Sequence, residues 1–376
     1  MSTIIRTRSP FFIRTPQESD SNLSYFLMTI QIYEGTSGVL PTCGGVFGSF
    51  TFKKKPLLNE TSVTFEISEL VNDHIKQTYN GTLSTSALTQ SVWVSVVTSA
   101  RESNGTIIGT ATSNTYLAQE GFNKFKEGVN YTTEPIAMIS GDYYEYHKGS
   151  SLNLPINKER VNQVVFKLNG STISTSTITD DLTSGQKIAY LSNPTSSQQY
   201  DQAVITYDTS STKSITFKEI EECKYPVQKI TFLNRWGALQ DLFFHKKSIE
   251  SLDTTSENFS RSTFKARTAT LGERDGDCEE TVTFNTYSTT AHAKKVHNAN
   301  GTESISLNSG FVDERMNPYF EELMVSENIW LTDDENVIYP VTLKDKNFTL
   351  KTGLNDRLIN YTMNFEKAFN FINDIA

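Results

Sequence analysis

The stretch 228–246 reads QKITFLNRWGALQDLFFHK, and it decides the fold more than any other part of the sequence. Two runs in which apolar and polar residues alternate flank a polar break at 234–237. Alternation of this kind is typical of a half-buried strand, and a short break that contains Gly237 allows the chain to reverse. The stretch therefore predicts a β-hairpin that carries Trp236 at its turn.

An aromatic side chain at the tip of a hairpin suits two roles. On a protruding turn, Trp236 would act with Arg235 and Phe243 as an anchor at a protein interface. Alternatively, Trp236 folds back and joins the core of its own domain. Burial is the favoured role, and the sequence leaves the interface open.

Composition indicates the fold class of the rest of the chain. The 376 residues are too many for one ordinary core, because domains cluster at roughly 100 to 200 residues. Apolar residues make up only 37%, yet 23 Phe and 16 Tyr stand among many Ser, Thr and Asn residues, which suits pleated, half-buried surfaces. We therefore expect a mainly β protein with two or three antiparallel β-sandwich-like domains in tandem and a few short helices.

Charge and hydropathy exclude several classes of function. A formal net charge of −9 argues against nucleic acid as the main partner, because neutralising phosphates requires clustered Lys and Arg. No stretch approaches the roughly 18 uninterrupted apolar residues of a membrane-spanning helix, and residues 1–10 lack the apolar core of a signal peptide. The sequence predicts a soluble protein that is made in a cytoplasm and does not insert into a membrane.

Two domains are expected in the first part of the chain. Residues 1–139 predict an N-terminal β-sandwich-like domain of short strands broken by turns. One helix interrupts it, because apolar residues recur at helical spacing from Ile67 to Ile75, and the Asn80-Gly81 pair would end this helix. Residues 140–225 are rich in Ser and Thr but keep alternating runs and aromatic residues, so they predict a middle β domain.

Residues 226–376 predict a C-terminal β-rich domain with one helix near 313–326, which Asp313 would cap. Its last strand runs from Ile359 to Phe365, where the apolar residues share one face. Tight turns are expected at Asn104-Gly105 and Asn169-Gly170. Further strands are expected at residues 26–33, 91–97, 164–168, 188–190, 203–207, 215–217, 264–271, 281–286 and 339–343.

The sequence offers only weak metal-binding candidates. His292 and His297 are five residues apart, beside an expected turn at Asn300-Gly301, whereas two ligands on one helix face require a spacing of three or four. A solvated loop is expected there. The acidic run 273–280 resembles a calcium loop, because Asp275 and Asp277 alternate. It lacks the further ligands and the closing Glu, so a charged hairpin tip is expected.

The sequence also shows no clear set of residues for covalent catalysis. Cys43, Cys223 and Cys278 are far apart and odd in number, which predicts reduced thiols. The sequence has no nucleophile elbow and no phosphate-binding loop, so we expect no enzyme activity and no cofactor. Glycoside cleavage requires only two carboxylates and therefore stays open.

Short motifs in a fixed order along the chain carry a resemblance. These motifs are RSPFFI at 8–13, IYEG at 32–35, FEISEL at 65–70, WVSV at 93–96, ITFLNRWG at 230–237, KKS at 246–248, LMVSENIWL at 323–331, PVTLKDKNFTLKT at 340–352 and NYTMNFEKA at 360–368. Together they resemble a family of virion tail proteins of tailed bacteriophages that infect Bacteroidetes, including the crAss-like phages. Gln240 departs from the family pattern, because a tryptophan or tyrosine is more usual there.

The resemblance implies a structural virion protein of a tail hub, baseplate or collar ring, made in the host bacterial cytoplasm. Its expected partners are other copies of itself in a cyclic ring and neighbouring virion proteins, and it implies no catalytic residues. Two alternatives remain: a receptor- or carbohydrate-binding tail module that uses exposed Tyr and Trp, and a virion-associated glycan hydrolase.

Overall fold

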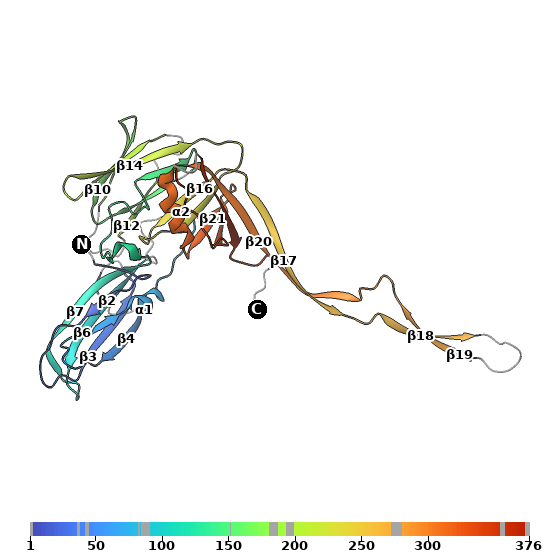
Figure 1. Ribbon diagram of the computed structural model, residues 1–376, viewed down its shortest axis with the longest axis horizontal. Coiled ribbons are helices and arrows are strands. Elements are labelled where there is room, and N and C mark those ends of the chain that lie inside the picture. The colour runs from blue at the N-terminus through green and yellow to red at the C-terminus, as the bar shows by residue number, and fades with distance from the viewer. Residues whose placement is uncertain are drawn as a thin grey trace. The chain divides into compact units, whose positions relative to one another are not determined.

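The computed structural model describes residues 3–35, 38–41, 45–81, 83, 91–150, 152–179, 187–192, 199–271, 280–353 and 358–372 (Figure 1). The expected mainly β class with a few short helices is confirmed. The chain divides into two compact units. Unit 1 contains residues 1–249 and 306–365, and unit 2 contains residues 250–305 and 366–376. Each of the three larger sheets is built from one of the three sections that the sequence indicates.

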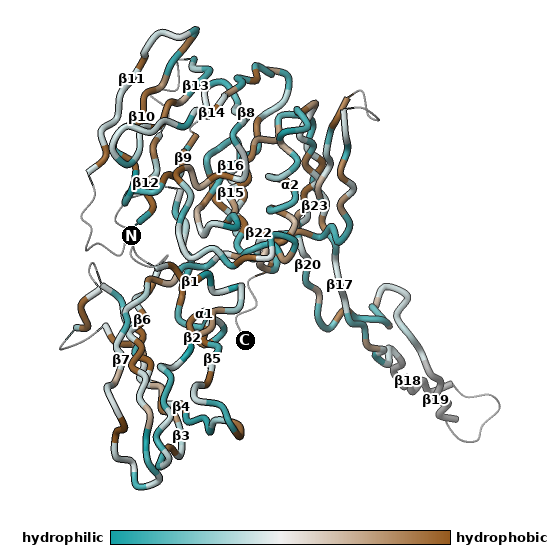
Figure 2. The backbone as a smooth tube through the Cα atoms, turned by 60° about the vertical axis from the view of Figure 1, so that its left-hand side comes forward, coloured by the Kyte–Doolittle hydropathy of each residue, from teal (hydrophilic) through white to brown (hydrophobic). Residues whose placement is uncertain are grey.

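The first sheet has five strands. In pairing order these are β1 (Ile4–Arg6), β7 (Ile107–Gln119), β6 (Ser91–Arg101), β3 (Tyr25–Tyr33) and β4 (Val46–Lys54). Side chains of β3 alternate between buried and half-buried, as the sequence predicts, and Val92, Val94 and Val96 make β6 strongly apolar (Figure 2). The chain turns at Asn104-Gly105 as expected, and Gly105 has a φ of +93°, but the connection is longer than a two-residue turn, because β6 ends at Arg101 and β7 begins at Ile107.

A second layer covers the apolar face of this sheet. It consists of the paired strands β2 (Phe12–Arg14) and β5 (Thr64–Glu66) and the helix α1 (Ser68–Asn72). Ile13, Phe65 and Val71 from this layer join one core cluster with Met28 and Val94 of the sheet. The two layers give this part of unit 1 its sandwich-like character.

The helix α1 is shorter than the sequence predicts, because it ends at Asn72 and not near Gly81. Beyond Asn72 the chain makes turn-type bonds, from His74 N to Val71 O (3.1 Å) and from Ile75 N to Asn72 O (3.1 Å). The Asn72 side chain accepts a hydrogen bond from Thr7 Oγ1 (2.6 Å), so a contact with the N-terminal segment fixes this end.

The second sheet lies in the middle section. In pairing order its strands are β11 (Ser171–Thr177), β10 (Val161–Leu168), β13 (Gln202–Tyr207), β14 (Ser211–Ile220) and β8 (Tyr143–His147), and a separate pair is formed by β9 (Asn153–Asn157) and β12 (Ile188–Ser192). The expected tight turn between β10 and β11 is confirmed, with φ of +49° at Asn169 and +80° at Gly170. Stacked rings of Tyr146 and Tyr200, 4.5 Å apart, stand in its core.

Two strand pairs differ from the expected antiparallel arrangement. β1 runs parallel to β7, and β8 runs parallel to β14. In both cases the two strands are far apart in sequence and are not joined by a hairpin, so nothing forces them to run in opposite directions. The first two sheets are therefore mixed.

The third sheet has the order β16-β15-β21-β22-β23-β20-β17, and β20 and β17 continue into unit 2. The bounds are β15 (Gln228–Leu233), β16 (Leu239–Phe244), β17 (Ile249–Ser260), β20 (Lys294–Val312), β21 (Ile329–Thr332), β22 (Ile338–Leu343) and β23 (Ile359–Lys367). The expected hairpin is confirmed as β15 and β16. The expected last strand is confirmed as β23, with Ile359, Tyr361, Met363 and Phe365 buried on one face.

The helix expected near 313–326 is also confirmed, with a changed first turn. A 3-10 turn, η3 (Glu314–Met316), precedes the helix α2 (Asn317–Met324). The Asp313 side chain caps the 3-10 turn by accepting a hydrogen bond from Arg315 N (3.0 Å). Phe320 of α2 packs against Tyr361 of β23, with ring centroids 4.6 Å apart.

Unit 2 consists mostly of a long two-stranded ribbon, residues 250–305, which we call the arm (Figure 1). It contains parts of β17 and β20 and the antiparallel pair β18 (Phe264–Leu271) and β19 (Glu280–Tyr287). Two expectations are wrong here. Asn300-Gly301 is not a turn and His297 is not in a loop, because both lie within β20. Asn300 instead holds the C-terminal segment, by accepting from Ile372 N (3.1 Å).

Candidate functional site

The tip of the β15–β16 hairpin is shaped by one side chain, Asn234. Its Oδ1 accepts hydrogen bonds from the backbone N atoms of Trp236 (2.9 Å) and Ala238 (3.1 Å), and its Nδ2 donates to Met138 O (2.6 Å) and Gln240 Oε1 (2.9 Å). Asn234 therefore closes the turn and also joins the hairpin to the segment before β8.

Gln240 is fully buried behind this tip. Its Oε1 lies 3.2 Å from Ser140 Oγ, and Ser140 Oγ donates to Glu322 Oε2 (2.7 Å). Glu322 also accepts from Arg235 N (3.2 Å). Burial raises the pKa of the Glu322 carboxyl, and these donors oppose the shift. The amide of Gln240 thus belongs to a buried polar network that an aromatic ring would not provide.

The backbone of the tip lies directly against the end of β7. Phe122 N donates to Arg235 O (3.0 Å), and a Cβ added at Gly121 would lie 2.7 Å from that same oxygen. Gly237 has a φ of +76°, and a Cβ added there would overlap the carbonyl oxygen of Glu120. Only glycine fits this approach without a shift of the backbone.

Trp236 is half-buried between two guanidinium groups. The Cζ atoms of Arg235 and Arg6 lie 4.4 Å and 4.7 Å from its ring centroid. Arg235 donates to both carboxylate oxygens of Glu127 (2.8 and 2.6 Å), which lowers the pKa of Glu127, and Arg6 Nη2 donates to Glu134 Oε2 (2.8 Å). Burial raises the pKa of the Glu134 carboxyl, and the nearby Arg6 guanidinium opposes this shift.

We call these residues together the hairpin joint: Arg6, Glu120, Glu127, Glu134, Ser140, Asn234, Arg235, Trp236, Gly237, Gln240 and Glu322. The joint connects all three sections of sequence within unit 1. Of the three residues predicted as a possible interface, Arg235 and Phe243 are buried in the chain and Trp236 is half-buried. Their side chains are therefore engaged inside unit 1.

Three carboxyl groups of the joint, those of Glu120, Glu134 and Glu322, have a raised pKa, and burial is the largest cause in each. Groups of this kind occur at catalytic sites, but also in structural networks. Here Glu120 accepts from Asn328 Nδ2 (3.0 Å), and the other two accept from Arg6, Ser140 and the Arg235 backbone. The arrangement fastens chain segments together.

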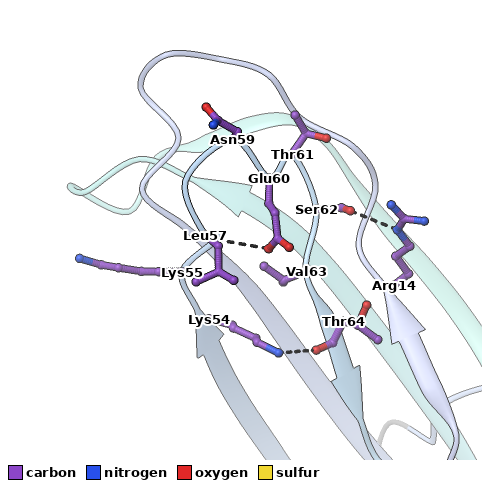
Figure 3. Close-up of a pocket in the computed structure, with 10 residues that line it drawn as sticks. All are labelled: Arg14, Lys54, Lys55, Leu57, Asn59, Glu60, Thr61, Ser62, Val63 and Thr64. Carbon is purple, nitrogen blue, oxygen red and sulfur yellow. Dashed lines mark hydrogen bonds between the residues drawn. The ribbon is translucent and has the colours of Figure 1, made fainter.

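A groove of about 650 Å³ opens beside the ends of β2, β4 and β5 and along the segment that connects β4 to β5, and Figure 3 shows its lining. Lys54 Nζ donates to Thr64 O (2.8 Å), and Arg14 Nε donates to Ser62 Oγ (3.1 Å). We call it the basic groove, because three cations and one carboxylate line it. The lining consists of Arg14, Lys54, Lys55, Leu57, Asn59, Glu60, Thr61, Ser62, Val63 and Thr64.

In each of two other grooves that contain a pair of acids, at least one acid has an internal partner. One groove contains Asp333 and Asp334, and Asp333 Oδ1 accepts from Val337 N (2.8 Å) in a turn. Another contains Asp313 and Glu314, and Asp313 pairs with Arg315. Neither arrangement presents two free carboxylates to a sugar, which the hydrolase alternative requires.

Of the other predicted candidates, His292 and His297 are both exposed, and His297 contacts the Phe259 ring edge-on. Cys223 is an exposed free thiol. Asp275, Asp277, Cys43 and Cys278 lie outside the described residues. Within the described ranges no group of three or more His, Cys, Asp or Glu side chains could hold a metal ion.

The sugar-binding alternative relies on exposed aromatic rings. Trp93 is buried and contributes to the core, and Trp236 and Trp330 are half-buried. Tyr131 and Tyr287 are exposed. No Trp ring therefore lies open for stacking on a sugar.

The described side chains of β17 in the arm are open to solvent. All twelve residues of β17 are exposed. Large apolar side chains stand among them, with exposed fractions of 47% for Leu252 and 43% for Phe259, and 50% for Val296 on β20. No described helix is long and apolar enough to cross a membrane. Comparisons with known proteins gave no match, either to a protein-family model or to a curated protein.

Proposed function

We propose that this chain is a structural protein of a bacteriophage virion, which assembles in the tail with copies of itself and with neighbouring virion proteins. The resemblance of the ordered motifs supports the virion, and the place in a tail hub, baseplate or collar ring rests on that resemblance alone. The observation that carries the assembly role is the exposed two-stranded arm.

A two-stranded ribbon has no second layer of its own to cover its faces. An isolated hairpin of this kind is marginally stable in water. Burying a large apolar side chain stabilises by roughly 1.5 to 3 kcal/mol, and Leu252, Phe259 and Val296 are each about half exposed. The arm therefore gains stability when another chain covers it, which is what a subunit of a closed ring provides.

The buried joint supports the same role for unit 1. It brings together charged and polar groups from residues as far apart as Arg6 and Glu322. Glu120, Glu127, Glu134 and Glu322 each accept at least one hydrogen bond from another part of the chain. Hydrogen bonds and ion pairs between distant segments stiffen a subunit, which suits a structural role. A catalytic centre instead needs groups that face a substrate.

Replacing Leu252, Phe259 and Val296 together by Ser should weaken self-association at least about tenfold, because three partly exposed apolar contacts are lost. Sedimentation velocity of the purified full chain over a range of concentrations measures this. Phe125→Ser is the matched control, because Phe125 of unit 1 is fully exposed. It should sediment as the unchanged chain does. A triple variant that sediments like the unchanged chain would refute the assembly role of the arm.

A further inference from the structure

Positive charge gathers at the basic groove although the whole chain carries a net charge of −9. Arg14, Lys54 and Lys55 line the groove and are exposed. In Figure 3 Lys55 and Arg14 stand at opposite sides of the groove. Three cations and one carboxylate line the groove, so its net positive charge favours an anionic ligand.

The other groups of the groove suit a carboxylate ligand. Asn59, Thr61 and Ser62 offer neutral polar side chains at its rim, and Arg14 uses only Nε for its bond to Ser62 among the contacts of the described residues. The planar guanidinium presents further N–H donors that match a carboxylate. The one acid, Glu60, already accepts from Leu57 N (3.4 Å).

The chain itself contains a strongly acidic segment. Residues 273–280 read ERDGDCEE, with five carboxylates and one arginine, so the net charge is 1 − 5 = −4. In sequence this segment connects β18 to β19, the inner two of the four consecutive strands β17, β18, β19 and β20. It is the most acidic run that the arm contains.

We propose that the basic groove of one copy receives the acidic segment 273–280 of a second copy. The proposal rests on the assembly role of the arm and names the contact that the arm makes. Groove and segment are different parts of the chain, so the contact is head-to-tail. In a pair of copies, the segment of one copy and the groove of the other stay free to bind further copies. Repeated contacts of this type close into a ring when the rotation between copies permits.

Charge reversal tests the contact in the full-length chain. A groove variant carries Lys54→Glu and Lys55→Glu, and a segment variant carries Asp275→Lys, Asp277→Lys and Glu279→Lys, which changes the net charge of the segment from −4 to +2. Each alone should self-associate at least about tenfold more weakly than the unchanged chain, because like charges then face each other. Lys224→Glu with Lys346→Glu is the matched control, because these two exposed lysines of unit 1 lie outside both the groove and the arm, and it should leave association unchanged.

Mixing the two variants distinguishes a contact between copies from one within a copy. In a 1:1 mixture each groove meets a segment of opposite charge on the other variant, so association should return to nearly the unchanged level. Sedimentation velocity of each variant alone and of the mixture gives the result. The proposal is overturned if either variant associates as the unchanged chain does, or if mixing restores nothing. If the apolar triple variant loses association and the charge variants do not, the assembly role of the arm is supported and the contact between groove and segment is refuted.

Discussion

A chain truncated after Asn355 should be insoluble or unfolded, because it loses β23 from the interior of the third sheet. β23 pairs between β22 and β20, and its residues Ile359, Tyr361, Met363 and Phe365 are all at least 95% buried. Each such side chain contributes roughly 1.5 to 3 kcal/mol, against a total stability of about 5 to 15 kcal/mol for a typical domain. The loss exceeds what unit 1 can tolerate.

The soluble fraction after expression and the thermal melt measure this effect. A chain truncated after Lys367 is the control, because it keeps β23 and removes only the residues that follow. It should stay soluble and melt cooperatively. If the shorter chain is equally soluble with an unchanged melt, β23 is not part of the core.

Gly237→Ala should destabilise unit 1 by about 3 kcal/mol or more. A non-glycine residue at positive φ costs roughly 1 to 2 kcal/mol, and an added methyl group in a filled space costs a further 1 to 3 kcal/mol. Both costs apply at Gly237, where φ is +76° and the new Cβ would overlap the Glu120 carbonyl oxygen.

Gly170→Ala is the matched control, because Gly170 has a φ of +80° and no atom within 4 Å of an added Cβ. It should lower the free energy of unfolding only by the cost of placing a non-glycine residue at positive φ, roughly 1 to 2 kcal/mol. Urea unfolding of both variants gives the two differences in the free energy of unfolding. Equal losses at Gly170 and Gly237 would show that the hairpin tip does not press against the end of β7.

Local patterns predicted much of the fold. The β15–β16 hairpin, the last strand β23 and the Asn169-Gly170 turn each follow from alternation or turn chemistry within a few neighbouring residues. The helix α2 follows from apolar spacing, and Asp313 caps the 3-10 turn that precedes it. These signals are local, so no contact with the rest of the chain is needed to read them.

The hairpin joint could not be predicted in the same way. Arg6 and Glu134 are 128 residues apart, and Arg235 and Glu127 are 108 residues apart, so no periodicity links them. In the sequence Gln240 stands next to Asp241 between apolar residues, and a polar pair in such a place needs polar partners when it is buried. The early end of α1 has a similar cause, since Thr7 bonds to Asn72 from far away in sequence.

The long strand β20 shows the opposite error. Asn300-Gly301 is a favourable turn pair, yet it lies in a continuous strand of nineteen residues. Turn chemistry there is overruled by pairing with other segments, because β20 pairs with β17 and β23, and Phe371 N of the C-terminal segment donates to Gly301 O (2.7 Å). Tertiary pairing commonly overrides local preference in strands.

The central claim is that this chain is a structural component of a phage particle. Quantitative mass spectrometry of purified virions of the phage that encodes it tests this most directly. The account predicts that the chain is present in several copies per particle, at a ratio to the major tail proteins that stays constant between preparations. Its absence from clean particles, or a trace amount that falls with each purification step, would contradict the account.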